Sequence, residues 1–157
     1  MSNPVPCWAP RKVRPKLPSQ RIRQSSYVYA AVCPESGDLC SLIMPYSNTD
    51  CMQIFLAEFA RQRAGKPTLL IMDQAAWHKS SALKTYPNIF VKFQPPYSPE
   101  LNPVEQLWMH IRTTFSHNCF WHSLVQLEDK LCEVLQGLSL SPETIISFSL
   151  FNRMTYV

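Results

Sequence analysis

The stretch from Gln94 to Trp108, which reads QPPYSPELNPVEQLW, constrains the fold of this chain more than any other. It contains four prolines and follows directly on an apolar run. Asn102 can cap a helix, and Pro103 fits the first helical position, where a missing N–H costs no hydrogen bond. Glu105 then lies in the first turn. The sequence therefore predicts a rigid elbow that holds one carboxylate at the start of a helix.

Composition indicates one globular domain. The chain has 157 residues, of which 46% are hydrophobic and 17% charged, enough to build a core. No apolar run approaches the roughly 18 to 20 residues that span a bilayer, and no apolar segment follows the N-terminal basic residues. The six cysteines form no Cys-x-x-Cys pair. We therefore expect a cytoplasmic protein with reduced thiols and no membrane partner.

The N-terminal residues 1–24 form a basic, proline-rich leader. They carry a charge of +6 without any acid, whereas the remaining residues 25–157 sum to −2. The basic residues are Arg11, Lys12, Arg14, Lys16, Arg21 and Arg23. Such a segment can follow a DNA backbone, because neutralising phosphates releases counterions. It can equally be a solvated leader, and the charge alone does not separate the two interpretations.

Periodicity along residues 25–157 predicts an α/β domain. An apolar run at 68–72 ends at Asp73 and has the composition of a central strand buried on both faces. The other expected elements are a hairpin of 27–32 and 39–46, helices over 49–63, 103–115, 123–137 and from 141, a short helix near 80–84, and a strand over 88–93. Together they predict a mixed sheet flanked by helices, with a site where the strands end.

Asp73 and Glu105 are the acids that this arrangement brings toward one site. Two carboxylates about 4 Å apart repel by roughly 4 kcal/mol at an effective dielectric near 20, so they need a proton or a cation between them. Mg²⁺ and Mn²⁺ prefer oxygen ligands, and a pair of such ions can assist phosphoryl transfer. The structural alternatives are that Asp73 caps the turn after its strand and that Glu105 closes a capping box with Asn102. Asp38 is expected to be a turn residue.

The histidines give a weaker signal. His78 is interpreted as an ordinary hydrogen-bonded histidine. His110, His117 and His122 lack a convincing metal-ligand spacing with any cysteine, so no zinc site is assigned.

Two motifs carry a resemblance to a known family. LIMDQAAWH, which contains Asp73 and His78, and PPYSPELNPVEQLW, which contains Glu105, resemble the DDE superfamily of mariner-like and related bacterial insertion-sequence transposases. The resemblance implies an RNase H-like fold, an acidic triad that binds two Mg²⁺ or Mn²⁺ ions, and DNA transposition and integration at transposon ends and target DNA. By position in the motifs, Asp73 matches the second acid and Glu105, rather than Glu100, the third. His78 and Lys79 are then DNA-contact candidates, and Tyr97, Ser98 and the prolines are expected to be scaffold.

The chain departs from the family pattern because it lacks the first of the three acids. It should lie upstream of the segment around Trp8, yet no acidic residue precedes Glu35. We therefore expect a partial catalytic domain that lacks the first strand of the fold and does not cleave DNA alone. A sheet edge left open by a missing strand invites pairing with a second copy or with an upstream-encoded N-terminal fragment. The alternative is a catalytically inactive DNA-binding or subunit-pairing fragment that regulates or complements a transposase.

Overall fold

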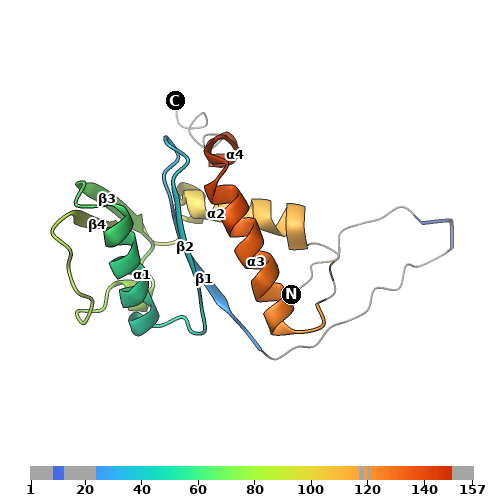
Figure 1. The fold of residues 1–157 in the computed structure, drawn as a ribbon, viewed down its shortest axis with the longest axis horizontal. Helices are drawn as coiled ribbons and strands as arrows, with labels where there is room; N and C mark the ends of the chain where they lie inside the picture. The colour runs from blue at the N-terminus through green and yellow to red at the C-terminus, as the bar shows by residue number, and fades with distance from the viewer. Residues whose placement is uncertain (1–8, 13–23, 117–118, 120, 150–157) are drawn as a thin grey trace.

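The structure, a computed structural model, describes residues 9–12, 24–116, 119 and 121–149. It is a mixed α/β fold of two small sheets and four α-helices in these residues (Figure 1). The elements are β1 (Tyr27–Val32), β2 (Leu39–Met44), α1 (Thr49–Gln62), β3 (Thr68–Met72), β4 (Ile89–Phe93), α2 (Pro103–Ile111), α3 (Leu124–Ser139) and α4 (Pro142–Ser149). A π-helical turn, Arg112–Ser116, prolongs α2.

The hairpin of β1 and β2 confirms its prediction. The strands pair antiparallel from Tyr27 opposite Met44 to Val32 opposite Leu39. The turn contains Gly37 at a φ of +71°, and a Cβ placed there would lie 2.3 Å from the carbonyl oxygen of Pro142 at the start of α4. Both the backbone conformation and the close approach of α4 therefore require glycine at this position.

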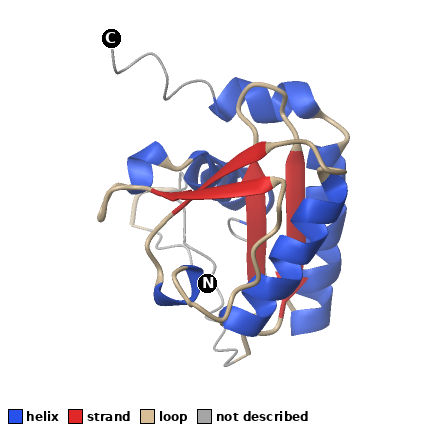
Figure 2. Cartoon of the chain, turned by 90° about the vertical axis from the view of Figure 1, so that its left-hand side faces the viewer, coloured by secondary structure: helices blue, strands red, loops and turns tan. Residues whose placement is uncertain are grey.

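The strands form two sheets rather than the single mixed sheet that was expected. β3 and β4 pair in parallel, from Thr68 beside Ile89 to Met72 beside Phe93. Within the described residues, neither strand hydrogen-bonds to the hairpin. Figure 2 shows the two pairs of strands crossing steeply instead of lying side by side. β3, expected to be central, is consequently paired along one edge only.

Helix α1 covers one face of both sheets. Asn48 caps it, its Oδ1 accepting a hydrogen bond of 2.9 Å from the backbone N–H of Cys51. The buried side of the helix packs against Tyr29 and Cys40 from the hairpin and against Leu70 and Met72 from β3. The buried helix residues are Cys51, Met52, Phe55, Leu56 and Phe59. Each large apolar side chain buried here contributes about 1.5–3 kcal/mol. One core thus joins the two sheets.

Helices α2, α3 and α4 form a second core on the opposite face of the hairpin. Leu107 and Ile145 are fully buried there, together with Ile111, Val134, Leu135 and Leu138. Val28, Ala30 and Ile43 of the hairpin pack against this cluster. Ser123 caps α3 by accepting a hydrogen bond from the backbone N–H of Gln126. The predicted helices near 103, 123 and 141 are therefore confirmed, and the hairpin lies between two layers of helix (Figure 1).

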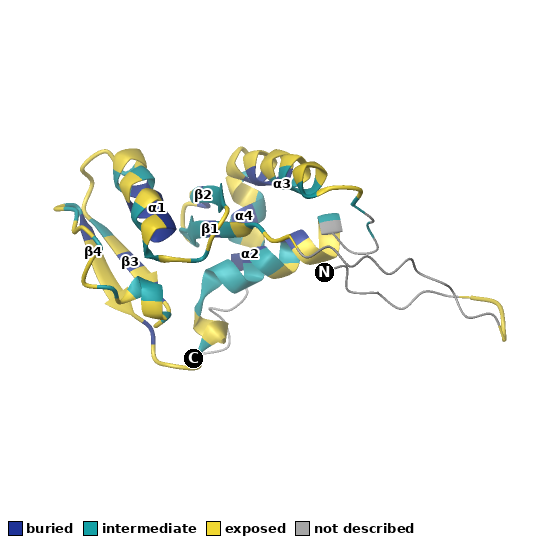
Figure 3. Ribbon diagram, turned by 90° about the horizontal axis from the view of Figure 1, so that it is seen from below, coloured by how far each residue is buried: buried dark blue, intermediate teal, exposed yellow. Residues whose placement is uncertain are grey.

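The expectation that β3 is buried on both faces is wrong. Leu69 and Ile71 are 60% and 53% exposed, and Phe90 on the same face of β4 is 58% exposed (Figure 3). Alternate residues of a strand point to opposite faces, and α1 covers only one of them. An apolar composition alone could not show that a covering layer is absent from the described part of the chain.

The expectation of a short helix near residues 80–84 is also wrong. These residues form a turn, and a single 3-10 turn lies earlier, at Ala76–His78. Side chains replace the helical hydrogen bonds: Ser80 Oγ accepts from the backbone N–H of Ala82, and Gln53 Oε1 accepts from that of Lys84. Such local bonds compete with helix formation.

None of the described helices is long and apolar enough to span a membrane. The five cysteines among the described residues are free thiols, and burial raises the pKa of the Cys40 thiol to about 11.

Candidate active site

Asp73 lies directly after the last residue of β3. Its Oδ1 accepts a hydrogen bond of 3.0 Å from the backbone N–H of Ala75 and lies 2.6 Å from Nδ1 of His78. The side chain is still 57% exposed, whereas that of His78 is 17% exposed. Asp73 therefore does cap the turn after its strand, as the structural alternative required. Only Oδ1 takes part in these contacts.

The elbow begins by attaching to the end of β3. Gln94 is buried, and its backbone N–H donates to the carbonyl of Met72 at 2.8 Å. Its own carbonyl accepts a bond of 2.9 Å from Nε2 of Gln74, whose Oε1 accepts one of 3.1 Å from the ammonium of Lys79. This chain of bonds fixes the first residue of the elbow beside Asp73.

The elbow ends at the capped start of α2. Oδ1 of Asn102 accepts from the backbone N–H of Val104 at 3.2 Å, and the N–H of Glu105 donates to the carbonyl of Asn102. The carboxylate of Glu105, which is half-buried, forms no hydrogen bond with any described residue. The capping box with Asn102 is therefore not formed. Glu105 is held at the helix start by its backbone, and within the described part of the chain its carboxylate forms no hydrogen bond.

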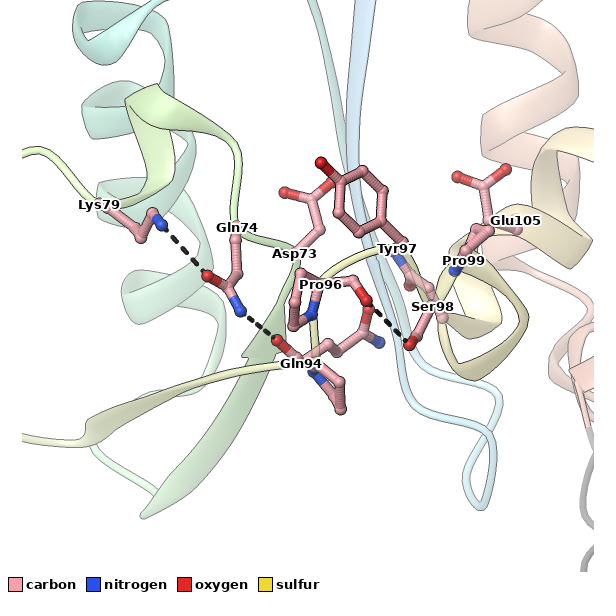
Figure 4. Close-up of a pocket in the computed structure, with 11 residues that line it drawn as sticks. Asp73, Gln74, Lys79, Gln94, Pro96, Tyr97, Ser98, Pro99 and Glu105 are labelled. Atoms are coloured by element: carbon pink, nitrogen blue, oxygen red, sulfur yellow. Dashed lines mark hydrogen bonds between the residues drawn. The ribbon is translucent and has the colours of Figure 1, made fainter.

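One open pocket of about 480 Å³ contains both acids (Figure 4). Its wall includes Asp73, Gln74, Lys79, Tyr97 and Glu105, with prolines of the elbow between them. Glu100, the competing acid, does not line it. Carboxylate oxygens are the ligands that hard divalent cations prefer, and an ammonium such as that of Lys79 attracts phosphate.

The other residues predicted to contact DNA divide into three groups. His78 is bonded to Asp73, and Lys79 belongs to the pocket wall. Arg11 and Lys12 are exposed in a turn and do not line the pocket. Arg14, Lys16, Arg21 and Arg23 lie outside the described residues.

Among the residues that the structure does describe, no group of three His, Cys, Asp or Glu side chains could hold a metal ion.

Sequence reasoning missed three residues of this pocket. Gln74 and Gln94 brace the ends of β3 and β4 against each other, and polar residues at the ends of two consecutive strands were the available signal. Tyr97 was expected to be scaffold, but it is 100% exposed. An aromatic residue between prolines, outside any periodic apolar pattern, could have indicated that it packs on no core.

Comparison with known proteins adds an independent observation. A model of the DDE superfamily endonuclease family matches residues 2–128, which include both acids. The uncharacterized protein y4pE/y4sA of Sinorhizobium fredii (strain NBRC 101917 / NGR234) is 38% identical over 126 residues, 80% of this chain and 93% of that protein. The insertion element IS630 uncharacterized 39 kDa protein of Shigella sonnei is 37% identical over 87 residues, 53% of this chain and 25% of that protein. No solved structure matches the chain significantly.

Proposed function

The chain belongs to the DDE superfamily endonuclease family, and from this premise we propose that it contributes two of the three catalytic carboxylates of a DNA transposase. In this proposal it is part of an RNase H-like catalytic domain that cuts DNA at transposon ends and joins them to a target. The observation that carries the proposal is that Asp73 and Glu105, from separate elements, line one open pocket (Figure 4).

The donor chemistry of the pocket suits Mg²⁺ or Mn²⁺. Both ions favour carboxylate oxygens, and Glu105 has no competing hydrogen bond among the described residues. When bound, such ions stabilise the attacking and leaving oxygens of a phosphoryl transfer. The contribution of this chain is positioning: His78 and the N–H of Ala75 hold Oδ1 of Asp73, and the capped start of α2 holds the backbone of Glu105.

Two carboxylates are too few for a two-metal site, so we place the first carboxylate on residues outside this sequence. No acidic residue precedes Glu35. β1 and β3 each have an unpaired edge among the described residues, and α1 already packs on both sheets. A strand inserted between those edges would complete one mixed sheet if the two strand pairs, which now cross steeply, turned toward one plane. A carboxylate at the end of that strand would then complete the acidic site.

The experiment compares the chain alone with the chain plus the polypeptide encoded immediately upstream of Met1. With Mn²⁺ and supercoiled plasmid that carries the element ends, we expect no nicking by the chain alone. We expect nicking by the co-purified pair, abolished by Asp73→Asn and by Glu105→Gln. Glu100→Gln is the matched control, since Glu100 lies on the same elbow but outside the pocket.

Three results would contradict this proposal. Nicking by the chain alone that Asp73→Asn abolishes would show that the site is already complete. Nicking by the pair that survives both substitutions would remove the role of the two acids. A failure of the two polypeptides to co-purify would remove the proposed source of the missing strand.

The second candidate function is a catalytically inactive fragment that pairs with a transposase subunit or binds DNA. The open edges of β1 and β3 favour it, because an unpaired strand edge can accept a strand from another chain. It predicts inhibition of a complete transposase by this chain. Under this alternative, Glu105→Gln leaves the inhibition unchanged.

A further inference from the structure

Tyr97 has a conformation that the packing of the protein does not explain. Its φ of +58° is in the left-handed region, which is unfavourable for a residue with a Cβ. Its side chain is 100% exposed, and no described residue hydrogen-bonds to its hydroxyl or contacts its ring. Within the described residues, no packing or hydrogen bond of this side chain compensates for the strain in its backbone. Such residues concentrate at ligand sites.

The elbow restricts the backbone of Tyr97 from both sides. Pro95 and Pro96 precede Tyr97, and Pro99 follows two residues later, which restricts the backbone around it. The hydroxyl of Ser98 donates to the carbonyl of Pro96 at 3.3 Å. The buried Gln94 attaches this segment to β3. The ring is therefore presented to solvent by a rigid support, so a ligand that stacks on it need not order the loop first.

The position of the ring relates it to the two acids. Tyr97 lines the same pocket as Asp73 and Glu105, and it is drawn between them in Figure 4. Lys79 lines this pocket too. A nucleotide combines a phosphate, which a bound cation or an ammonium attracts, with a flat base that stacks on an aromatic ring. The pocket offers a partner for each part.

We propose that Tyr97 is a stacking platform for an unpaired base of the DNA strand whose phosphate lies over Asp73 and Glu105. This inference rests on the proposed function, since it takes DNA as the ligand of the pocket. A base inside a duplex has both faces covered by its neighbours, so only an unpaired base can use the ring. Stacking is tolerant of sequence, which means that the platform selects the unpaired state rather than a particular base.

The test is DNA binding by the full chain in the presence of Mn²⁺, followed by fluorescence anisotropy, because a bound cation is what attracts the phosphate to the two carboxylates. One labelled duplex carries a short unpaired 5′ extension, and a second duplex of the same length is fully paired. We expect tighter binding to the first, and Tyr97→Ala should weaken that binding roughly 5- to 100-fold while leaving the paired duplex unchanged. Tyr97→Phe keeps the ring and should retain the preference. Tyr46→Ala, which removes another exposed tyrosine outside the pocket, is the matched control.

The outcomes separate this inference from the proposed function. Equal affinity of the wild type for the two duplexes, or an unchanged preference in Tyr97→Ala, overturns the stacking platform. An equal loss on both duplexes also overturns it, because Tyr97 would then be a general DNA or protein contact. If the preference depends on Tyr97 but the completed pair does not nick DNA, the platform stands and the proposed catalysis fails. If the wild type binds neither duplex, the platform fails, and the proposed catalysis is judged separately by nicking with the completed pair.

Discussion

Nδ1 of His78 lies 2.6 Å from Oδ1 of Asp73, so the imidazole holds one oxygen of the carboxylate that ends β3. The two residues are five positions apart and are brought together by the 3-10 turn Ala76–His78. This contact restricts the rotation of the carboxylate. His78 is therefore a hydrogen-bonded histidine, as expected, and its partner is the candidate site carboxylate itself.

His78→Ala should weaken Mn²⁺ binding by roughly 10- to 100-fold, because partners that orient a ligating carboxylate contribute about that much to metal affinity. The measurement is a titration followed by the electron paramagnetic resonance of free Mn²⁺. His78→Asn places an amide N–H near the position of Nδ1 and should restore most of the affinity. Equal affinities in the wild type and in His78→Ala would show that the contact only stabilises the turn.

Tyr97→Gly should raise the free energy of unfolding by about 0.5–1 kcal/mol. Glycine removes a left-handed penalty of roughly 1–2 kcal/mol, and its extra chain entropy in the unfolded state takes back part of that gain. The exposed ring has no packing to lose. Urea unfolding measures the change, with Tyr46→Gly as the control at an exposed tyrosine whose φ is not positive. A destabilised Tyr97→Gly would mean that the ring packs on something in solution.

Ile71→Lys should reduce self-association of the purified chain without destabilising it. Leu69, Ile71 and Phe90 form an exposed apolar face beside the unpaired edge of β3, and such surfaces associate in water. Sedimentation velocity over a range of concentrations measures the effect. Ile54→Lys is the matched control, since Ile54 is 55% exposed on α1, away from that face. Equal effects of the two substitutions would show that net charge, not the face, controls association.

The contact of Asp38 with Arg63 should make a small, pH-dependent contribution to stability. Ser36 and the guanidinium of Arg63, 3.0 Å away, lower the pKa of Asp38 by bonding its charged form. The stabilisation is therefore present above the ordinary Asp pKa and is lost as the pH falls through the lower folded-state value. Because Asp38 is 58% exposed, we expect at most about 1 kcal/mol at pH 7. A double-mutant cycle of Asp38→Asn and Arg63→Gln measures it, and a coupling energy that persists near pH 2 would contradict this account.

The sequence was sufficient to predict those elements whose formation depends on neighbouring residues. The hairpin of β1 and β2 and the proline-led start of α2 each depend on a few neighbouring residues, and both formed as predicted. Asp73 and Glu105 do line one pocket, and their role as metal ligands stays a prediction.

The predictions that were wrong depend on contacts between segments that lie far apart in the sequence. Whether Leu69 and Ile71 are buried depends on a layer beyond β3, about which the apolar run carries no information. The residues near Ser80 formed a turn because Gln53, far earlier in the chain, bonds to the backbone of Lys84. Tyr97 is unusual in its exposure, which its place between prolines could have indicated, and in its φ, which cannot be read from residue types.

The arrangement of the two cores has a consequence for the acids. Asp73 follows a strand packed only under α1, whereas Glu105 belongs to a helix of the core on the other side of the hairpin. The β3–β4 sheet has one bare face, so its amides should exchange with deuterium sooner than those of the hairpin. A cation held by both carboxylates would bridge the two cores and slow that exchange. Deuterium uptake across β3 can therefore report occupancy of the pocket even in a chain that cuts no DNA.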